Sequence, residues 1–191
     1  MNRRTLIKSL GAVPLVGLAP FLHTVHAQTA AKKGTPSVED LQKNWKTLLA
    51  DGTSVPAAGE KVDLPKAEWK KKLDPQQYKV LREEGTERAG TSPLDNEKRP
   101  GVFVCIGCGL PLFTSAMKFD SGTGWPSFFT TIPGAFGTSR DFKMILPRTE
   151  YHCARCGGHH GHVFNDGPAP TGQRYCNNGV ALKFIPKTGK A

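Results

Sequence analysis

Five cysteines are the residues of this 191-residue chain whose type and spacing point most directly to chemistry. Four of them form two C-x-x-C pairs, Cys105/Cys108 and Cys153/Cys156, and Cys176 stands apart from both pairs. A thiolate is both a strong nucleophile and a strong metal ligand. We therefore expect the two pairs to bind a metal ion and the fifth cysteine to attack an electrophile.

The four paired cysteines have the spacing of a closed metal site. Each C-x-x-C lets two thiolates converge from one tight turn, and Gly107 and Gly157 give those turns the backbone freedom that they need. Four sulfur ligands complete a tetrahedron with no open position, so we expect one structural Zn²⁺ per chain. Two alternatives remain on the residues alone, an iron–sulfur centre and a pair of redox disulfides, and closed four-thiolate sites favour zinc over both.

The neighbours of Cys176 favour a nucleophile. Alternate residues of a strand share a face, so Arg174, Cys176 and Asn178 are predicted to point the same way. A guanidinium beside a thiol favours the thiolate, which is the form that attacks. A single cysteine can also be a small buried hydrophobic residue, and this alternative stays open on the cysteine alone.

Four motifs, in order, carry a family resemblance. They read "WKKKLDPQQYKVLREEGTE" at 69–87, "CIGCGLPLF" at 105–113, "FDSGTGWPSF" at 119–128 and "CARCGGHHGHVFNDGPAPTGQRYCNN" at 153–178. The chain resembles zinc-containing methionine-R-sulfoxide reductases of the B type over residues 65–186. The resemblance implies an oxidoreductase of the oxidative stress response that reduces protein-bound methionine-R-sulfoxide to methionine, through a sulfenic acid on Cys176.

The resemblance also implies roles for several side chains. His159 and His162 match the family's His-x-Gly-His-x-Phe motif and would protonate the sulfoxide oxygen. His160 stands where the family has an apolar residue, and we expect it to be structural. Without the resemblance, a cluster of three histidines could also be read as a metal site.

The same likeness assigns the substrate pocket. Trp125, helped by Phe164, would form the wall of a pocket for the S-methyl group and so select one sulfoxide epimer; alone, Trp125 would be read as a core residue. Arg174 would stabilise the thiolate, and Asn178 would form a hydrogen bond near the site.

One departure from the family changes the expected recycling step. Many relatives carry a second, resolving cysteine in the Gly-x-Gly-Trp loop, where this chain has Thr123. A disulfide from Cys176 within the chain would therefore consume a metal ligand. We expect the reductant to be an external thiol, such as a thioredoxin-like protein. The segment 89–100 also differs from the usual family loop.

Residues 1–27 have the features of an export signal. Arg3 and Arg4 precede a short apolar stretch at 9–22, and Ala27 ends a small-residue cleavage site. The run "NRRTLIKSL" resembles a twin-arginine signal, so we expect a periplasmic or otherwise exported protein with no membrane association after cleavage. A membrane anchor is the alternative, but the apolar stretch is too short to span and is interrupted by Gly and Pro.

The charge does not indicate a nucleic-acid partner. The net charge of +10 falls to +7 without residues 1–27, which carry three basic residues and no acidic one. The basic residues are scattered and are not interleaved with aromatic ones. Two other functions remain as alternatives: an exported zinc-ribbon-like binding module, and a disulfide oxidoreductase whose C-x-x-C is free of metal.

These residues have to be positioned by a mainly β fold, with short N-terminal helices and an antiparallel core of two small sheets. Helices are expected from Ser37 to Leu49, at 67–73, and from Asp74 to Gly85, where Asp74, Pro75 and Gln77 form an N-terminal cap. The expected strands are 101–105, 127–132, 138–146, 148–153, 161–164 and 173–185. The expected parts of the chain, which we take to be monomeric, are the signal (1–27), a linker and short helix (28–64), the reductase domain (65–186) and a tail (187–191).

Overall fold

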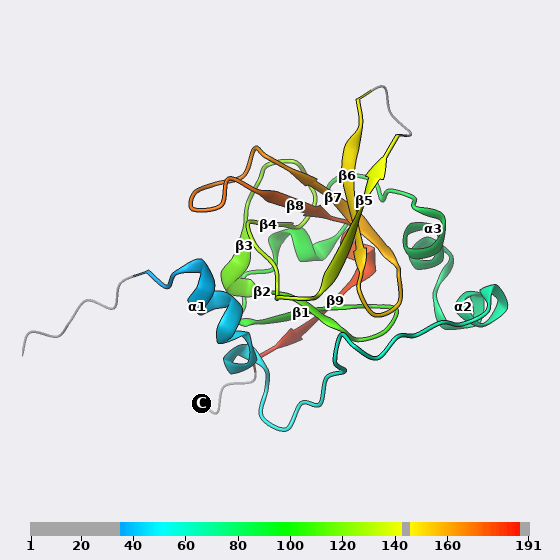
Figure 1. Cartoon of the computed structure of the whole chain (residues 1–191), viewed down its shortest axis with the longest axis horizontal. Helices are drawn as coiled ribbons and strands as arrows, with labels where there is room; N and C mark the ends of the chain where they lie inside the picture. Colours follow the sequence, from blue (N-terminus) through cyan, green and yellow to red (C-terminus); the bar gives the residue numbers. More distant parts are fainter. Residues whose placement is uncertain (1–34, 143–145, 188–191) are drawn as a thin grey trace, which may run out of the picture. The chain divides into compact units, whose positions relative to one another are not determined.

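Two antiparallel sheets form the core of the computed structural model, which describes residues 35–142 and 146–187 (Figure 1). The three-stranded sheet has the order β2-β1-β9, with β1 at Gly101–Cys105, β2 at Pro111–Thr114 and β9 at Leu182–Pro186. The six-stranded sheet has the order β3-β4-β8-β7-β6-β5, with β3 at Lys118–Phe119, β4 at Ser127–Phe128, β5 at Phe136–Asp141, β6 at Arg148–Cys153, β7 at His159–Phe164 and β8 at Arg174–Asn177. The predicted fold class is confirmed.

The predicted single strand at 173–185 is wrong. It consists of two strands, β8 and β9, which belong to different sheets and are separated by the 3-10 helix η4 (Gly179–Ala181). The sequence Asn-Asn-Gly at 177–179 is typical of a turn, because Asn side chains bond to nearby backbone and Gly adopts many conformations. The chain therefore passes from the six-stranded to the three-stranded sheet directly after Cys176.

Other strand boundaries also differ from the expectation. In the segment 127–132 only β4, two residues long, belongs to a sheet; beyond it, isolated backbone bonds such as Ile132 N–H to the Leu112 carbonyl (2.9 Å) hold the chain. The strand expected at 138–146 is β5, which begins at Phe136 and ends at Asp141. The short strands β2 and β3 were not predicted, since a stretch of two to four residues has too few positions to show a period.

Two of the α-helices begin after a capping box that the sequence encodes. Ser37 caps α1 (Val38–Lys43), but the expected helix to Leu49 continues only as the 3-10 helix η1 (Trp45–Leu48). The remaining helices are α2 (Lys66–Lys72), α3 (Pro75–Glu83), and the 3-10 helices η2 (Pro93–Asn96) and η3 (Ser115–Met117). Asp74 accepts hydrogen bonds from the Gln76 and Gln77 amides, and Gln77 bonds back to the Asp74 amide. Helix α3 is closed by Glu84, its C-cap, which adopts the left-handed conformation (φ 53°), one residue before the expected Gly85.

Aromatic side chains fill the space between the two sheets. Phe113 of the smaller sheet stacks on Phe128 of the larger one, with ring centroids 3.9 Å apart and planes 6° from parallel. Tyr151 is fully buried beside them, with its ring edge toward Phe113 at 6.4 Å. On the outer side, Figure 1 shows α3 next to the hairpin of β6 and β7, and its Tyr78, Val80 and Leu81 are buried.

The expected export signal at 1–27 lies outside the residues that the structure describes. Within residues 35–142 and 146–187, no helix combines the length and the apolar character needed to cross a membrane.

Replacing the cap of α3 should measurably weaken the fold. We expect Asp74→Ala to lower the free energy of unfolding by about 1 kcal/mol, because two backbone amides at the helix start lose their acceptor. Glu68→Ala, which removes only an exposed ion pair with Lys71, is the control and should cost about 0.3 kcal/mol. Urea denaturation of both variants checks this, and an equal cost for the two would contradict the assigned cap.

Candidate active site

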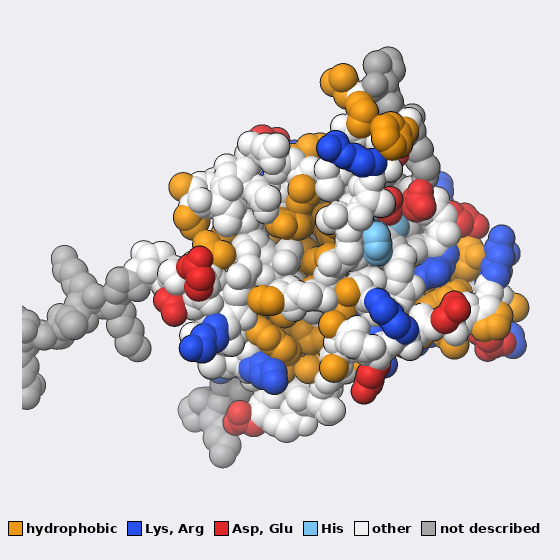
Figure 2. Space-filling model, in the orientation of Figure 1, with side chains coloured by type: hydrophobic (Ala, Val, Ile, Leu, Met, Phe, Trp, Pro, Cys, Tyr) orange, Lys and Arg blue, Asp and Glu red, His pale blue; other side chains and the backbone are white. Residues whose placement is uncertain are grey.

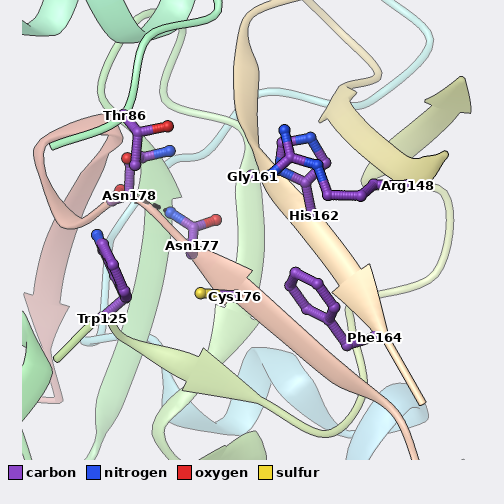
Figure 3. A pocket seen from close by; sticks show the side chains of 9 residues that line it. All are labelled: Thr86, Trp125, Arg148, Gly161, His162, Phe164, Cys176, Asn177 and Asn178. Carbon is purple, nitrogen blue, oxygen red and sulfur yellow. Dashed lines mark hydrogen bonds between the residues drawn. The ribbon is translucent and has the colours of Figure 1, made fainter. Parts of the chain in front are cut away.

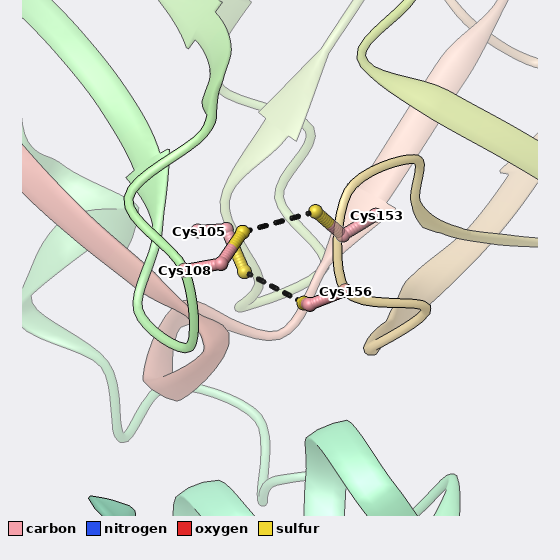
Figure 4. A group of neighbouring side chains, drawn as sticks. All are labelled: Cys105, Cys108, Cys153 and Cys156. Atoms are coloured by element: carbon pink, nitrogen blue, oxygen red, sulfur yellow. Dashed lines mark hydrogen bonds between the residues drawn. The ribbon is translucent and has the colours of Figure 1, made fainter. Parts of the chain in front are cut away.

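The four paired cysteines meet in one buried cluster (Figure 4). Their sulfur atoms all lie within 4.8 Å of one another. Cys105 Sγ is 3.7 Å from Cys156 Sγ, and Cys108 Sγ is 3.5 Å from Cys153 Sγ. Four thiolates around a Zn²⁺ ion at about 2.3 Å would be separated by roughly 3.8 Å along each edge of the tetrahedron. The donor set and its spacing therefore fit a tetrahedral metal ion.

The four sulfur atoms also affect one another's ionisation. Hydrogen bonding to the neighbouring sulfurs raises the pKa of Cys105 and lowers that of Cys108. Four thiols in this space cannot all ionise unless a cation balances their charge. The turns that carry them are braced by two arginines: Arg155 donates to the Cys108 carbonyl and Arg82 to the Cys156 carbonyl, both at 2.8 Å.

Cys176 lies in β8 on the wall of a cavity of about 130 Å³. Its cross-strand neighbour in β7 is His162, and its neighbour in β4 is Ser127. Figure 3 shows Trp125 and Phe164 on opposite sides of the sulfur. The cavity is lined by Thr86, Trp125, Arg148, Gly161, His162, Phe164, Cys176, Asn177 and Asn178. Its volume suits a small group at the end of a side chain and is well below that of a cofactor site.

Burial and charge act on Cys176 in opposite directions. Burial raises the pKa of the thiol above its usual 9.0, while the Arg174 guanidinium and a hydrogen bond with Thr123 lower it. Arg174 thus acts on the thiol in the direction expected, toward the thiolate, although the effect of burial on the pKa is larger. Arg174 is itself held by a bidentate ion pair with Asp166, at 2.8 and 2.9 Å, and its guanidinium lies 4.4 Å from the Phe164 ring centre.

The two histidines taken from the motif differ in position. His162 lines the cavity and bonds through Nε2 to Asp141 (2.7 Å), which also accepts from Arg148 (2.6 Å). Burial lowers the pKa of His162, and the bond to Asp141 offsets only part of that change. His159 lies behind it, with ring centres 5.5 Å apart, and its Nδ1 is 2.6 Å from Glu150.

Two residues of the His-His-Gly-His stretch have structural positions. His160 points into the core against Phe136, and burial lowers its pKa to about 3, so it is neutral at pH 7. A Cβ atom at Gly161 would overlap the Cys176 carbonyl. Glycine there allows β7 to approach β8 closely enough to place His162 beside Cys176.

Trp125 is fixed by the segment that follows α3. Its indole N–H donates to the Glu87 carbonyl (3.2 Å), and the Glu87 amide donates to Oδ1 of Asn178 (2.9 Å). Asn178 lies just beyond the end of β8 and does not continue the strand as predicted; its Nδ2 donates to the His160 carbonyl (2.9 Å).

Comparison with known proteins decides the family. The SelR domain model matches residues 73–186. The chain belongs to the SelR domain family. Peptide methionine sulfoxide reductase B1, chloroplastic, of Arabidopsis thaliana is 50% identical over 149 residues, which are 78% of this chain and 74% of that protein. Peptide methionine sulfoxide reductase MsrB of Pseudomonas putida is 52% identical over 131 residues, 68% of this chain and 98% of that protein. The enzyme of the same name from Agrobacterium fabrum is 51% identical over 127 residues, 66% and 94% of the two chains.

The SelR domain thus brings five predicted residues around one cavity and leaves two behind them. Cys176, Trp125, Phe164, His162 and Asn178 line it, whereas Arg174 and His159 support it from outside the lining. The sequence did not reveal the other residues that line the cavity or hold these side chains, which are Thr86, Glu87, Asp141, Arg148, Glu150 and Asp166. Only Asp166, which lies between Phe164 and Arg174 in the chain, is close enough in sequence to have been suspected.

Removing the cation beside the thiol should make Cys176 of this SelR domain less reactive. We expect Arg174→Gln to raise the pKa of Cys176 further, because the guanidinium is the main group that lowers it. The pH at which alkylation of Cys176 by iodoacetamide reaches half its maximal rate then moves upward. Mass spectrometry of the Cys176 peptide across a pH series gives this midpoint.

The exposed Arg140 of β5 supplies the control. Arg140→Gln should leave the alkylation midpoint of Cys176 where it is. An unchanged midpoint in Arg174→Gln would contradict the electrostatic role of Arg174.

Proposed function

We propose that this chain repairs oxidised exported proteins, with Cys176 as the nucleophile, an external thiol as the reductant and Zn²⁺ in the four-cysteine site. The enzyme class follows from membership of the SelR domain family and from identities near 50% to peptide methionine sulfoxide reductases. The chain is a peptide-methionine (R)-S-oxide reductase. The observation that carries the proposed mechanism is the cross-strand pairing of Cys176 with His162 at one small apolar cavity.

In the first step the Cys176 sulfur attacks the sulfur of methionine sulfoxide. The sulfoxide oxygen takes up a proton and passes to the cysteine sulfur, methionine leaves, and Cys176 becomes a sulfenic acid. The substrate sulfur gains two electrons and the cysteine sulfur loses two. No other redox partner is needed for this step.

His162 is placed to move the proton. Burial lowers the pKa of His162 and raises that of Cys176, so it favours a thiol that keeps its proton beside a neutral imidazole that can accept one. Because the two side chains are cross-strand neighbours, the thiol proton can pass by way of His162 to the sulfoxide oxygen as the sulfur attacks. Asp141 stabilises the imidazolium formed on the way. The hydrogen bond with Glu150 holds the His159 imidazole behind that of His162.

The apolar walls of the cavity provide the epimer selection. A sulfoxide sulfur carries an oxygen, a methyl group and the side-chain carbon, so fixing the methyl between Trp125 and Phe164 leaves the oxygen one direction for a given epimer. For the R epimer we propose that this direction is toward His162.

The sulfenic acid is then reduced from outside. The other four cysteines converge in the metal cluster, so none is available to Cys176. An external thiol, such as that of a thioredoxin-like protein, attacks the sulfenic sulfur, water leaves, and a second thiol of the reductant resolves the mixed disulfide. Thr123 stands where many relatives have the resolving cysteine, and its side chain forms a hydrogen bond with Cys176.

Export through the twin-arginine route and a monomeric state complete the proposal. The twin-arginine route exports proteins that are already folded, which suits a protein whose metal is bound during folding. On the face drawn in Figure 2, Lys and Arg side chains are separated by acidic and apolar ones, which does not favour a nucleic-acid partner. A zinc-ribbon-like binding module is the alternative function. The cavity argues against it, because a binding module needs no half-buried thiol with a histidine as its cross-strand neighbour.

Turnover of a single epimer tests this function. The purified mature chain with dithiothreitol should reduce a peptide containing methionine-R-sulfoxide and leave the S epimer, since only the R oxygen faces His162. Cys176→Ser should lower the rate by at least about a thousandfold while the zinc content and the unfolding midpoint stay unchanged. Chromatographic separation of methionine and sulfoxide peptides measures both. Reduction of the S epimer at a similar rate, or activity retained in Cys176→Ser, would contradict the proposal.

Loss of one cysteine of the cluster should cost the metal and the fold together. We expect about one Zn²⁺ per chain in the wild type, and Cys105→Ser should release it and destabilise the protein by several kcal/mol. Colorimetric zinc determination and thermal unfolding give the two results, with Cys176→Ser as the matched control. A Cys105→Ser protein as stable as the control would contradict a structural metal.

A further inference from the structure

Glu87 is a buried carboxylate that no step of the proposed reaction uses. Its exposed fraction is 3%, and burial raises its pKa. One carboxylate oxygen accepts from the Gly179 amide and the other from the Val180 amide (2.9 Å). These amides open η4, three and four residues beyond Cys176, so the carboxylate holds the crossover from β8 to β9.

The backbone of Glu87 contacts the opposite wall of the cavity as well. Its carbonyl accepts the Trp125 indole N–H at 3.2 Å, and its amide donates to the Asn178 side chain at 2.9 Å. Thr86, one residue earlier, lines the cavity. One residue is therefore bonded both to the Trp125 wall and to the segment that carries the nucleophile.

The residues after Glu87 tie the same two parts together. The Gly90 amide donates to the Gly124 carbonyl at 2.7 Å, next to Trp125. Gly124 has φ +82°, and a Cβ atom there would lie 2.8 Å from the Gly90 nitrogen, so the two loops are in close contact. The strand that follows Trp125, β4, is only two residues long. The position of the Trp125 indole thus depends more on the contact between the Gly90 and Gly124 loops than on strand pairing through β4.

We propose that Glu87 is a positioning residue that sets the separation between the Trp125 indole and the Cys176 sulfur, and thereby the fit of the cavity to the S-methyl group of the substrate. The inference rests on the proposed function. It concerns the size of the S-alkyl group that the same cavity accepts. The carboxylate acts on the nucleophile side through Gly179 and Val180, and the carbonyl acts on the indole side.

The size of the S-alkyl group is the property that reports this separation. In an apolar pocket one extra methylene costs roughly ten- to two-hundredfold in kcat/KM. Methionine-R-sulfoxide and ethionine-R-sulfoxide differ by one methylene at the alkyl group that faces Trp125. A cavity held at a fixed width discriminates between them, and a cavity whose walls have relaxed does not.

The experiment measures kcat and KM of the mature chain for a pair of peptides that differ only in these two residues. The wild type should prefer the methyl substrate by roughly ten- to two-hundredfold. In Glu87→Ala the preference should fall about tenfold, chiefly through a higher KM for the methyl substrate, because both amides of η4 lose their acceptor. Glu87→Gln keeps one acceptor oxygen and should lie between the two. The control is Glu83→Gln, an exposed carboxylate of α3, which should match the wild type.

A role in folding alone gives a different result. It predicts that the Glu87 variants lose kcat/KM for both substrates in the same proportion and keep the wild-type preference, and either variant showing this would overturn the inference. If Glu87→Ala does not fold, as judged by its unfolding curve, the preference of Glu87→Gln decides. Failure of the wild type to reduce either sulfoxide would instead contradict the proposed function and the inference with it.

Discussion

The convergence of four sulfur atoms from two different sheets is the constraint on which the rest of the structure depends. Cys105 and Cys108 come from the turn after β1 in the smaller sheet, and Cys153 and Cys156 come from the turn between β6 and β7 in the larger one. Bringing them within 4.8 Å fixes how the two hairpins meet. Strand β7 then leaves this cluster carrying His159 and His162, so the positions of both imidazoles are set from the end of the sheet where the four cysteines meet.

Strand β8, which carries Cys176, leads directly into a crossover between the sheets. Strand β8 lies between β4 and β7, and directly afterwards the chain crosses through η4 to β9. Asn177 is anchored in the core by the Tyr151 hydroxyl at 2.9 Å, while Cys176 faces the cavity. The thiol is thus held between a rigid core contact and a crossover that Glu87 fixes, which keeps it aligned with His162.

Local features of this chain could be predicted from the sequence and long-range ones could not. Three features that depend on neighbouring residues agree with the prediction. They are the cap at Asp74, the meeting of the two C-x-x-C pairs in one cluster, and the strand at 148–153. The carboxylates that hold the two histidines, Asp141 and Glu150, are brought in by strand register, so a single sequence does not reveal them. The pKa of Cys176 is the clearest case, since the neighbouring Arg174 is visible in the sequence and the larger effect of burial is not.

The most direct test of the account is the state of the five thiols after a single turnover. The mature chain, treated with one equivalent of an R-sulfoxide peptide and no reductant, is digested and its cysteine peptides are weighed by mass spectrometry. The account predicts one added oxygen on Cys176 and no change on the other four cysteines once their metal is removed. Formation of methionine with an unmodified Cys176, or a disulfide between Cys176 and a cysteine of the cluster, would contradict it.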